Sequence, residues 1–327
     1  MPALRRAAGL LSALLVLWVI VAPAAVADTS GFTVTDDRLT APVGWTTDAD
    51  HSLYWTANST PDTKKTTVIG VGADGRVRAV LSYPQSTKGV LAVGYDAGNL
   101  YVLDASPKAN TLRLSYVTLT GLVVSGSVPY HFYELLLPEA GQTIAALIVE
   151  PQKQFAVVSS EGRVYKGPSK PTLAGTNRLT RATGGAATVT GAYYDAAQKA
   201  VVLRTPDGIA TADPTTFATR ATVPVAAAAD GRGITSALDG QSYLLGRGNG
   251  TTVLAVSLSG ALLSPSPSAS SSAPQSASPS PTDSVAGTPA AAPSGPTGQL
   301  FGNATRLALG GALLMALVAG LIAAARR

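Results

Sequence analysis

The sequence predicts an all-β body over residues 28–263, and three observations support this fold class. Short apolar runs alternate with turns rich in Gly, Asp and Asn. No stretch of the body has the 3.6-residue period of a helix. A turn that opens with an acidic residue recurs along the chain, each time four or five residues before an apolar run. Such regular hairpins indicate a repeated β architecture.

The expected strands are short runs of aliphatic, aromatic and β-branched residues, the types that fit a half-buried pleated surface. They are expected at Leu53–Thr56, Thr67–Val71, Leu100–Leu103, Ala145–Val149, Phe155–Ser159, Ala200–Arg204 and Val253–Ser257.

The recurring acidic turns give the length of the repeat. Successive turns are 48, 54, 45 and 44 residues apart, at Asp48, Asp96, Glu150, Asp195 and Asp239. Two hairpins in about 45 residues is the length of a four-stranded propeller blade. The body is therefore predicted to be a β-propeller of five blades, or of six if residues 105–150 contain a degenerate blade. A β-sandwich with regular hairpins is the alternative.

The net charge of +5 suggests an acidic partner at first sight. The excess lies entirely in five arginines near the two ends, and residues 28–303 contain equal numbers of basic and acidic residues. The body therefore lacks the basic patch that nucleic-acid binding needs. The chain has no cysteine, which excludes a disulfide framework and a thiol nucleophile. It has only two histidines, so a multi-histidine metal site is not expected.

The N-terminus follows the pattern of a secretory signal peptide. Arg5 and Arg6 precede an apolar run, Pro23 ends it, and Ala25-Val26-Ala27 provides a small-x-small cleavage site. We expect residues 1–27 to be removed, with a retained signal anchor as the alternative.

The C-terminal region predicts a stalk and a membrane anchor. Residues 264–303 are rich in Ser, Pro and Ala, a composition that cannot bury a core, so a disordered stalk is expected. Residues 304–325 form an apolar segment long enough to cross a bilayer, followed by the stub Arg326-Arg327. The positive-inside rule places this stub in the cytoplasm and the body outside, as in a type I single-pass membrane protein. Small residues recur every four positions in the span and suggest helix association: Ala308, Ala312, Ala316, Gly320 and Ala324.

Several stretches of the body resemble a known family. They read FTVTDDRL, SLYWTAN, VVSSEGRVYKGP and TVTGAYYDAAQKAVVLRTPDG, within residues 31–215. This pattern resembles the actinobacterial β-propellers of the WD40-like or NHL-like kind that are secreted or membrane-anchored. The resemblance implies a propeller fold, with acidic clusters before several inner strands and a His-Asn-Asp group after the first-blade tryptophan. Here the matching stretches read YWTANST, GVLAVGY and TIAALIV, so only Asn58 of the polar group is present and apolar residues replace the acids.

Candidate functional residues are few. His51, which follows Asp48 and Asp50 in one turn, fits either a metal ligand or a solvated hairpin tip. The aromatic segment Tyr130, His131, Phe132 and Tyr133 lies in the longest repeat interval and is predicted either to bind a partner or to pack between blades. Trp45 and Trp55 are expected in the core. Motifs for a serine nucleophile elbow, a P-loop or a zinc protease are absent from the sequence.

These observations favour a non-enzymatic function. The chain is predicted to be a membrane-tethered extracytoplasmic propeller that binds a protein or an envelope polymer, without a cofactor or a nucleic-acid partner. The span offers a route to self-association. A calcium-assisted hydrolase or lactonase-type propeller and a structural envelope protein are the alternatives.

Overall fold

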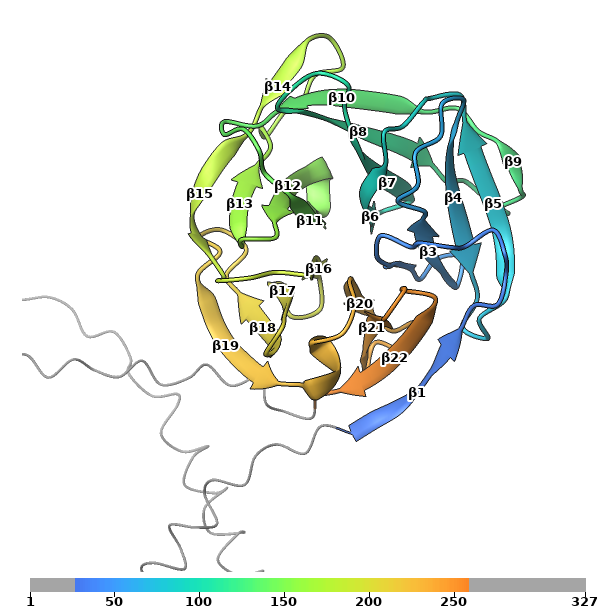
Figure 1. The fold of residues 1–327 in the computed structure, drawn as a ribbon, viewed down its shortest axis with the longest axis vertical. Helices are drawn as coiled ribbons and strands as arrows, with labels where there is room; N and C mark the ends of the chain where they lie inside the picture. The colour runs from blue at the N-terminus through green and yellow to red at the C-terminus, as the bar shows by residue number, and fades with distance from the viewer. Residues whose placement is uncertain (1–26, 259–327) are drawn as a thin grey trace, which may run out of the picture. The chain divides into compact units, whose positions relative to one another are not determined.

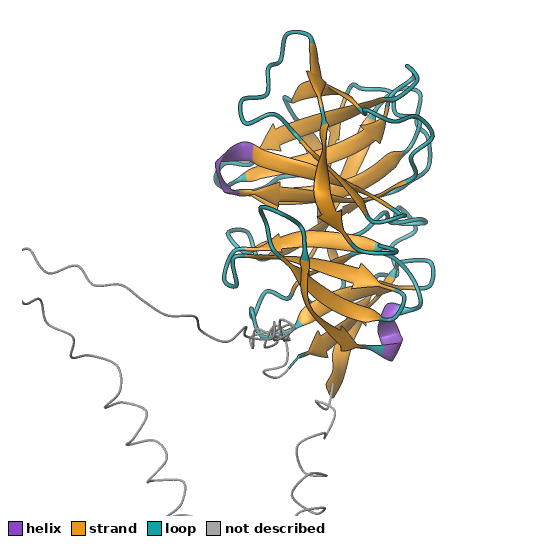
Figure 2. Ribbon diagram, turned by 90° about the vertical axis from the view of Figure 1, so that its left-hand side faces the viewer, coloured by secondary structure: helices purple, strands orange, loops and turns teal. Residues whose placement is uncertain are grey.

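The computed structural model describes residues 27–258, which form a five-bladed β-propeller (Figure 1). Two short 3₁₀ turns, η1 (Pro151–Lys153) and η2 (Ala226–Ala228), lie on opposite faces of the all-β body (Figure 2). Within residues 27–258 neither helical turn is long and apolar enough to cross a membrane. The predicted stalk, the span and its stripe from Ala308 to Ala324 lie outside the described residues.

Each blade is an antiparallel sheet whose first strand is innermost, with parallel additions in blades 1 and 2. Blade 1 contains β2 (Thr46–Asp48), β3 (Leu53–Ala57), β4 (Thr66–Val71), β5 (Val77–Tyr83) and β9 (Gly126–Ser127). Blade 2 contains β6 (Val90–Asp96), β7 (Asn99–Ala105), β8 (Thr111–Thr118), β10 (His131–Leu136) and β14 (Thr176–Arg178). Blade 3 contains β11 (Ile144–Glu150), β12 (Gln154–Ser159), β13 (Arg163–Lys166) and β15 (Thr180–Gly185). Blade 4 contains β16 (Gly191–Asp195), β17 (Ala200–Thr205), β18 (Gly208–Ala212) and β19 (Thr219–Pro224). Blade 5 contains β20 (Ile234–Ser236), β21 (Tyr243–Arg247), β22 (Thr252–Ser257) and β1 (Ala27–Thr33).

The ring is closed by pairing the two ends of the described chain. β1 is the outermost strand of blade 5 and pairs antiparallel with β22, from Ala27 opposite Ser257 to Thr33 opposite Thr252. The first and last strands therefore share one sheet, and they lie side by side in Figure 1. The hydrogen bonds of this sheet hold blade 5 against unravelling from either end.

The blade count settles the alternatives that the sequence left open. The structure has five blades, so the six-bladed propeller and the β-sandwich are wrong. The longest repeat interval contains no sixth blade. It contains β9 and β10 instead, which add an outer strand to blade 1 and blade 2 respectively. Each of the seven expected strands lies within an observed strand.

The acidic turns all fall at one end of the propeller. Four of the five acidic residues end the innermost strand of a blade, and Asp239 follows β20 by three residues. We call the side with the loops between first and second strands the hairpin end. Asp195 shows why an acidic residue recurs there, because its Oδ1 accepts the backbone N–H groups of Ala197 and Gln198 at 3.0 and 3.1 Å.

Apolar packing between neighbouring blades holds the ring together. Five buried clusters form the core, one at each junction between two blades. Trp55, which is fully buried, belongs to the cluster between blades 1 and 2, and Trp45 belongs to the cluster between blades 5 and 1. The prediction that both tryptophans lie in the core is confirmed.

Candidate functional site: a pocket in the central channel

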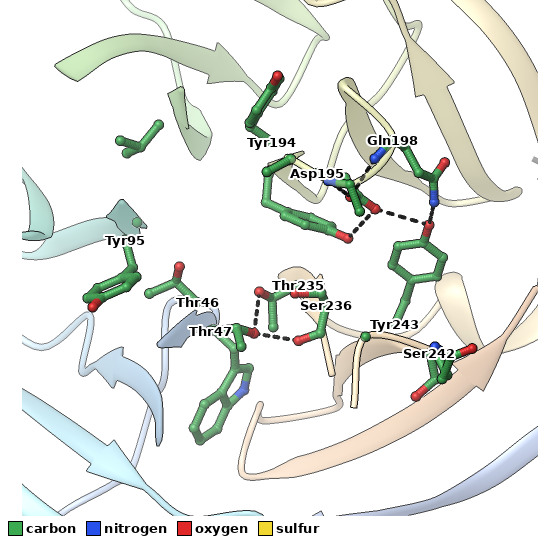
Figure 3. Close-up of a pocket in the computed structure, with 18 of the residues that line it drawn as sticks. Thr46, Thr47, Tyr95, Tyr194, Asp195, Gln198, Thr235, Ser236, Ser242 and Tyr243 are labelled. Atoms are coloured by element: carbon green, nitrogen blue, oxygen red, sulfur yellow. Dashed lines mark hydrogen bonds between the residues drawn. The ribbon is translucent and has the colours of Figure 1, made fainter. Parts of the chain in front are cut away.

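A pocket of about 820 Å³ lies where the innermost strands converge, toward the hairpin end of the central channel (Figure 3). Every blade contributes a residue near the end of its innermost strand: Thr47, Tyr95, Val149, Asp195 and Ser236. The pocket continues outward between blades 4 and 5, where Tyr243 and the last described residues, Ser257 and Leu258, line it. A concave site with apolar walls and a few convergent polar groups is the usual form of a small-ligand site.

Asp195 is the centre of the polar wall. Its Oδ2 accepts hydrogen bonds from the phenols of Tyr193 at 3.3 Å and Tyr243 at 3.4 Å, while its Oδ1 accepts the backbone bonds of its turn. Gln198 donates through Nε2 to the Tyr243 oxygen, so an ordered chain runs from Gln198 through Tyr243 to the carboxylate (Figure 3). These contacts fix the carboxylate in one orientation before any ligand arrives.

Burial keeps the two phenols protonated. It raises the pKa of Tyr243 to about 12, and the negative charge of Asp195 adds to the shift. Burial followed by the Asp195 charge also raises the pKa of Tyr193 well above its ordinary value. Both side chains are therefore hydrogen-bond donors near neutral pH, and Asp195 is their acceptor.

The walls differ in chemistry from one side to the other. Val93, Leu147 and Val149 of blades 2 and 3 give an apolar wall. On the facing side, the Thr47 hydroxyl lies 2.9 Å from the Thr235 hydroxyl and donates to the Ser236 carbonyl, linking blade 1 to blade 5. The pocket therefore presents an apolar surface opposite a hydroxyl-rich one.

The other end of the channel is narrowed by three glycines. A Cβ on Gly191 would lie 2.7 Å from the Cα of Gly233, and a Cβ on Gly233 would lie 2.7 Å from the Cα of Gly44. The backbones of blades 4, 5 and 1 therefore approach each other directly at the start of their innermost strands. This close approach narrows the channel at that end on the side of blades 4, 5 and 1.

His51 has a structural role that neither sequence interpretation included. Its Nδ1 lies 2.8 Å from Asp48 Oδ2 and its Nε2 lies 3.0 Å from the carbonyl oxygen of Gly121. Asp48 is fully buried and also accepts the indole N–H of Trp55 at 2.9 Å. His51 is thus not a free hairpin tip, and it ties the loop around Gly121 to the hairpin of blade 1.

The predicted aromatic segment lies at the outer side of blade 2. Tyr133 is buried, with 6 % of its surface exposed, whereas Phe132 is 40 % exposed and His131 is exposed. Tyr130 stacks on Tyr83 with 4.6 Å between ring centroids, and His131 stacks on Tyr116 at 5.3 Å. The segment therefore packs against blades 1 and 2 and leaves Phe132 and His131 open to a partner. Its role in binding stays a prediction.

A calcium-assisted hydrolase would need several oxygen ligands around the ion. Within residues 27–258 no three His, Asp or Glu side chains gather in a way that could hold a metal ion. Among the described residues that line the pocket, Asp195 is the one carboxylate. Asn58, the residue left from the polar group of the resembling family, accepts the backbone N–H of Thr40 and of Ala41 and donates to the carbonyl of Arg38. Its amide therefore shapes the connection into blade 1 and does not face the channel pocket.

Sequence reasoning identified Asp195 as a turn residue and missed its second role. The stretch Tyr193-Tyr194-Asp195 ends an inner strand, so its side chains reach the channel mouth once the blades close into a ring. The pairing of Asp195 with Tyr243, 48 residues further along the chain, has no local sequence signal.

Comparisons with known proteins found similar solved structures of low identity. No protein-family model and no curated protein matches the sequence. A gluconolactonase structure from Xanthomonas campestris is 12% identical, over 72% of this chain and 96% of that one, with a TM-score of 0.43. A putative 6-phosphogluconolactonase from Bacteroides uniformis is 12% identical, over 63% and 64%, with a TM-score of 0.38. A chain of a nidogen/laminin complex is 14% identical, over 62% and 70%, with a TM-score of 0.42. These likenesses concern the fold, and no substrate is transferred from them.

Proposed function

We propose that this protein is a binding module held at the outer face of a cell membrane, and that its ligand enters the channel pocket from the hairpin end. The observation that carries this proposal is the pocket of about 820 Å³, lined by all five blades. Its polar groups are ordered by their own hydrogen bonds, which lowers the entropic cost of binding.

The predicted tether fits this geometry. The last described residues, Ser257 and Leu258, line the pocket, and the predicted stalk begins at residue 264. A body tethered in this way samples ligands close to the membrane and carries no net charge that would hold it against an anionic polymer.

Site-specific photo-crosslinking in living cells tests the binding site. A photoreactive amino acid at Gln241, which is exposed and lines the pocket, should yield a discrete crosslinked product. The matched control is Arg232, an exposed residue in the segment that leads into β20, at the opposite end. Equal products from both positions would contradict the proposal. Products from Phe132 alone would move the binding surface to the aromatic segment of blade 2.

Fractionation tests the tether separately. Full-length protein should remain with the membrane after a high-salt wash, and a chain that lacks residues 304–327 should be recovered from the medium. Protease added to intact cells should degrade the body of the full-length protein. Recovery of the truncated chain with the membrane would show that another part of the protein holds it there.

A further inference from the structure

The charge of the channel pocket points to a class of ligand, and this inference rests on the proposed function. Among the described residues that line the pocket, Asp195 is the only Asp or Glu, and none is Lys, Arg or His. Lys199 lies on the same hairpin as Asp195 but is exposed and does not line the pocket. An anionic ligand would meet a carboxylate here without a compensating cation, which is costly in a partly buried site.

The hydrogen bonds to the Asp195 carboxylate bring no positive charge that would neutralise it. All four donors to its carboxylate, two backbone N–H groups and two phenols, are neutral. The two phenol bonds, at 3.3 and 3.4 Å, are long for a carboxylate acceptor. Oδ2 therefore keeps acceptor capacity on the pocket side, where a stronger and charged donor would improve on both bonds.

The aromatic lining favours the same charge. Five aromatic side chains line the pocket: Trp45, Tyr95, Tyr193, Tyr194 and Tyr243. The faces of such rings carry negative electrostatic potential and attract organic cations within about 6 Å of the ring centroid. A hydrated metal ion gains less from rings, and the described residues offer no set of three ligating side chains.

Other carboxylates at the hairpin end do not line the pocket. Burial raises the pKa of Asp96 and also that of Glu150, which favours their neutral forms. Asp50 accepts the phenol of Tyr95 at 3.0 Å, and Asp48 is paired with His51. Asp195 is therefore the carboxylate that a cation in the pocket would meet.

We propose that the channel pocket binds a ligand through a protonated amine, which donates to Asp195 Oδ2 while the aromatic rings surround its alkyl stem. The ligand class is an organic ammonium compound, such as an amine-bearing residue of a larger envelope component.

Binding of a defined amine by the full-length protein in detergent tests this inference. The probe is the tripeptide acetyl-Gly-Lys-Gly-amide, compared by calorimetry with the same peptide acetylated on the lysine Nζ. The lysine peptide should bind, and acetylation should weaken binding about tenfold or more because the charged donor is lost. Raising the salt concentration should weaken the lysine peptide alone.

Variants locate the interaction. Asp195→Asn keeps an acceptor for the turn and should weaken the lysine peptide about tenfold or more. The matched control is Asp37→Asn, the same change at an exposed residue outside the pocket. Tyr194→Leu leaves the Asp195 turn intact and should weaken binding about threefold or more through the lost ring. Near-UV circular dichroism checks that each variant is folded.

Two outcomes would overturn the inference: equal binding of both peptides, or equal affinity of the protein and Asp195→Asn. Failure of the lysine peptide to bind at about 10 mM would do so as well, because the site would then be weaker than any useful amine site. If crosslinks from Gln241 persist in that case, the binding function stands and its ligand is not an amine. If those crosslinks are also missing, the proposed function fails with it.

Discussion

The guanidinium of Arg204 lies 2.6 Å from the carbonyl oxygen of Gly246, so a side chain of blade 4 bonds the backbone of blade 5. Arg204 is fully buried, and its guanidinium also donates to four carbonyl groups between β19 and β20, those of Ala227, Ala228, Asp230 and Gly233. Burial lowers its pKa to about 10, which leaves it charged near neutral pH. One arginine thus satisfies five acceptors that the connection between two blades would otherwise bury without partners.

Replacing Arg204 should be among the most damaging single changes in the body. Arg204→Met keeps much of the volume but leaves the five carbonyl groups without their donor, and we expect a loss of about 3 kcal/mol or more in the free energy of unfolding. Urea denaturation measures the change. The control is Arg220→Met, which removes an exposed arginine paired with Asp213 and should cost less than about 1 kcal/mol. Similar losses for the two variants would contradict this role of Arg204.

A buried carboxylate between blades 1 and 2 should make stability depend on pH. Asp104 is fully buried and accepts hydrogen bonds from Gln85 Nε2 at 3.0 Å and from the Thr87 hydroxyl at 2.7 Å. Burial raises its pKa to about 6, and the hydrogen bonds oppose that shift. Between about pH 4 and pH 6 the unfolded chain therefore releases its proton before the folded chain does. Stability falls as pH rises through this window, by up to about 3 kcal/mol.

Asp104→Asn isolates this effect. From pH 4 to pH 7, the unfolding free energy of the variant should rise relative to that of the parent by up to about 3 kcal/mol. Asp213→Asn should move the other way, mainly below about pH 4, because hydrogen bonds from Thr216 and Arg220 lower the pKa of Asp213 to about 2 and its contribution is lost in acid. A pH-independent difference for Asp104→Asn would refute the assignment.

Each ring nitrogen of His51 lies within hydrogen-bond distance of an oxygen, Asp48 Oδ2 on one side and the carbonyl oxygen of Gly121 on the other, so the side chain joins the two. His51→Leu should release the loop of residues 119–125, which contains the exposed Leu122, from the hairpin of blade 1. Hydrogen–deuterium exchange of that loop should rise while the exchange of β7 stays unchanged. His131→Leu is the control, since His131 is exposed and stacks on Tyr116. Unchanged exchange in His51→Leu would show that other contacts hold the loop.

The fold could be predicted from the sequence to the extent that its signals are local. An aspartate such as Asp195 binds the N–H groups of its own turn, so the acidic repeat follows from contacts within three residues. The repeat therefore predicted the blades, and the apolar runs predicted seven of the 22 strands of the described chain. The pairing of β14 with β10 was missed because it is parallel and joins residues about 40 positions apart, so no connecting turn marks it in the sequence.

The candidate site could be predicted only in part, for the same reason. The five partners of Arg204 are backbone carbonyls 23 to 42 residues away, which any sequence offers. The pocket likewise exists only after five strands from five repeats converge. Tyr243 and Asp195 therefore carry no shared motif, although each was visible as part of a strand or a turn.

The glycines at the far end of the channel allow a last test, of how closely the blades approach there. Gly233 has φ +79°, and a Cβ on it would lie 2.7 Å from Gly44 Cα, on the backbone of the neighbouring blade. Gly240 has φ +65° and no heavy atom within 4 Å of its would-be Cβ. Gly240→Ala should therefore cost only the left-handed strain of about 1 kcal/mol. Gly233→Ala adds a clash that the ring must open to relieve, and we expect a loss at least about 2 kcal/mol larger in urea denaturation. Because both residues need positive φ, the difference between the two variants measures the contact between blades. Equal losses would mean that blades 5 and 1 have room to separate at this end of the channel.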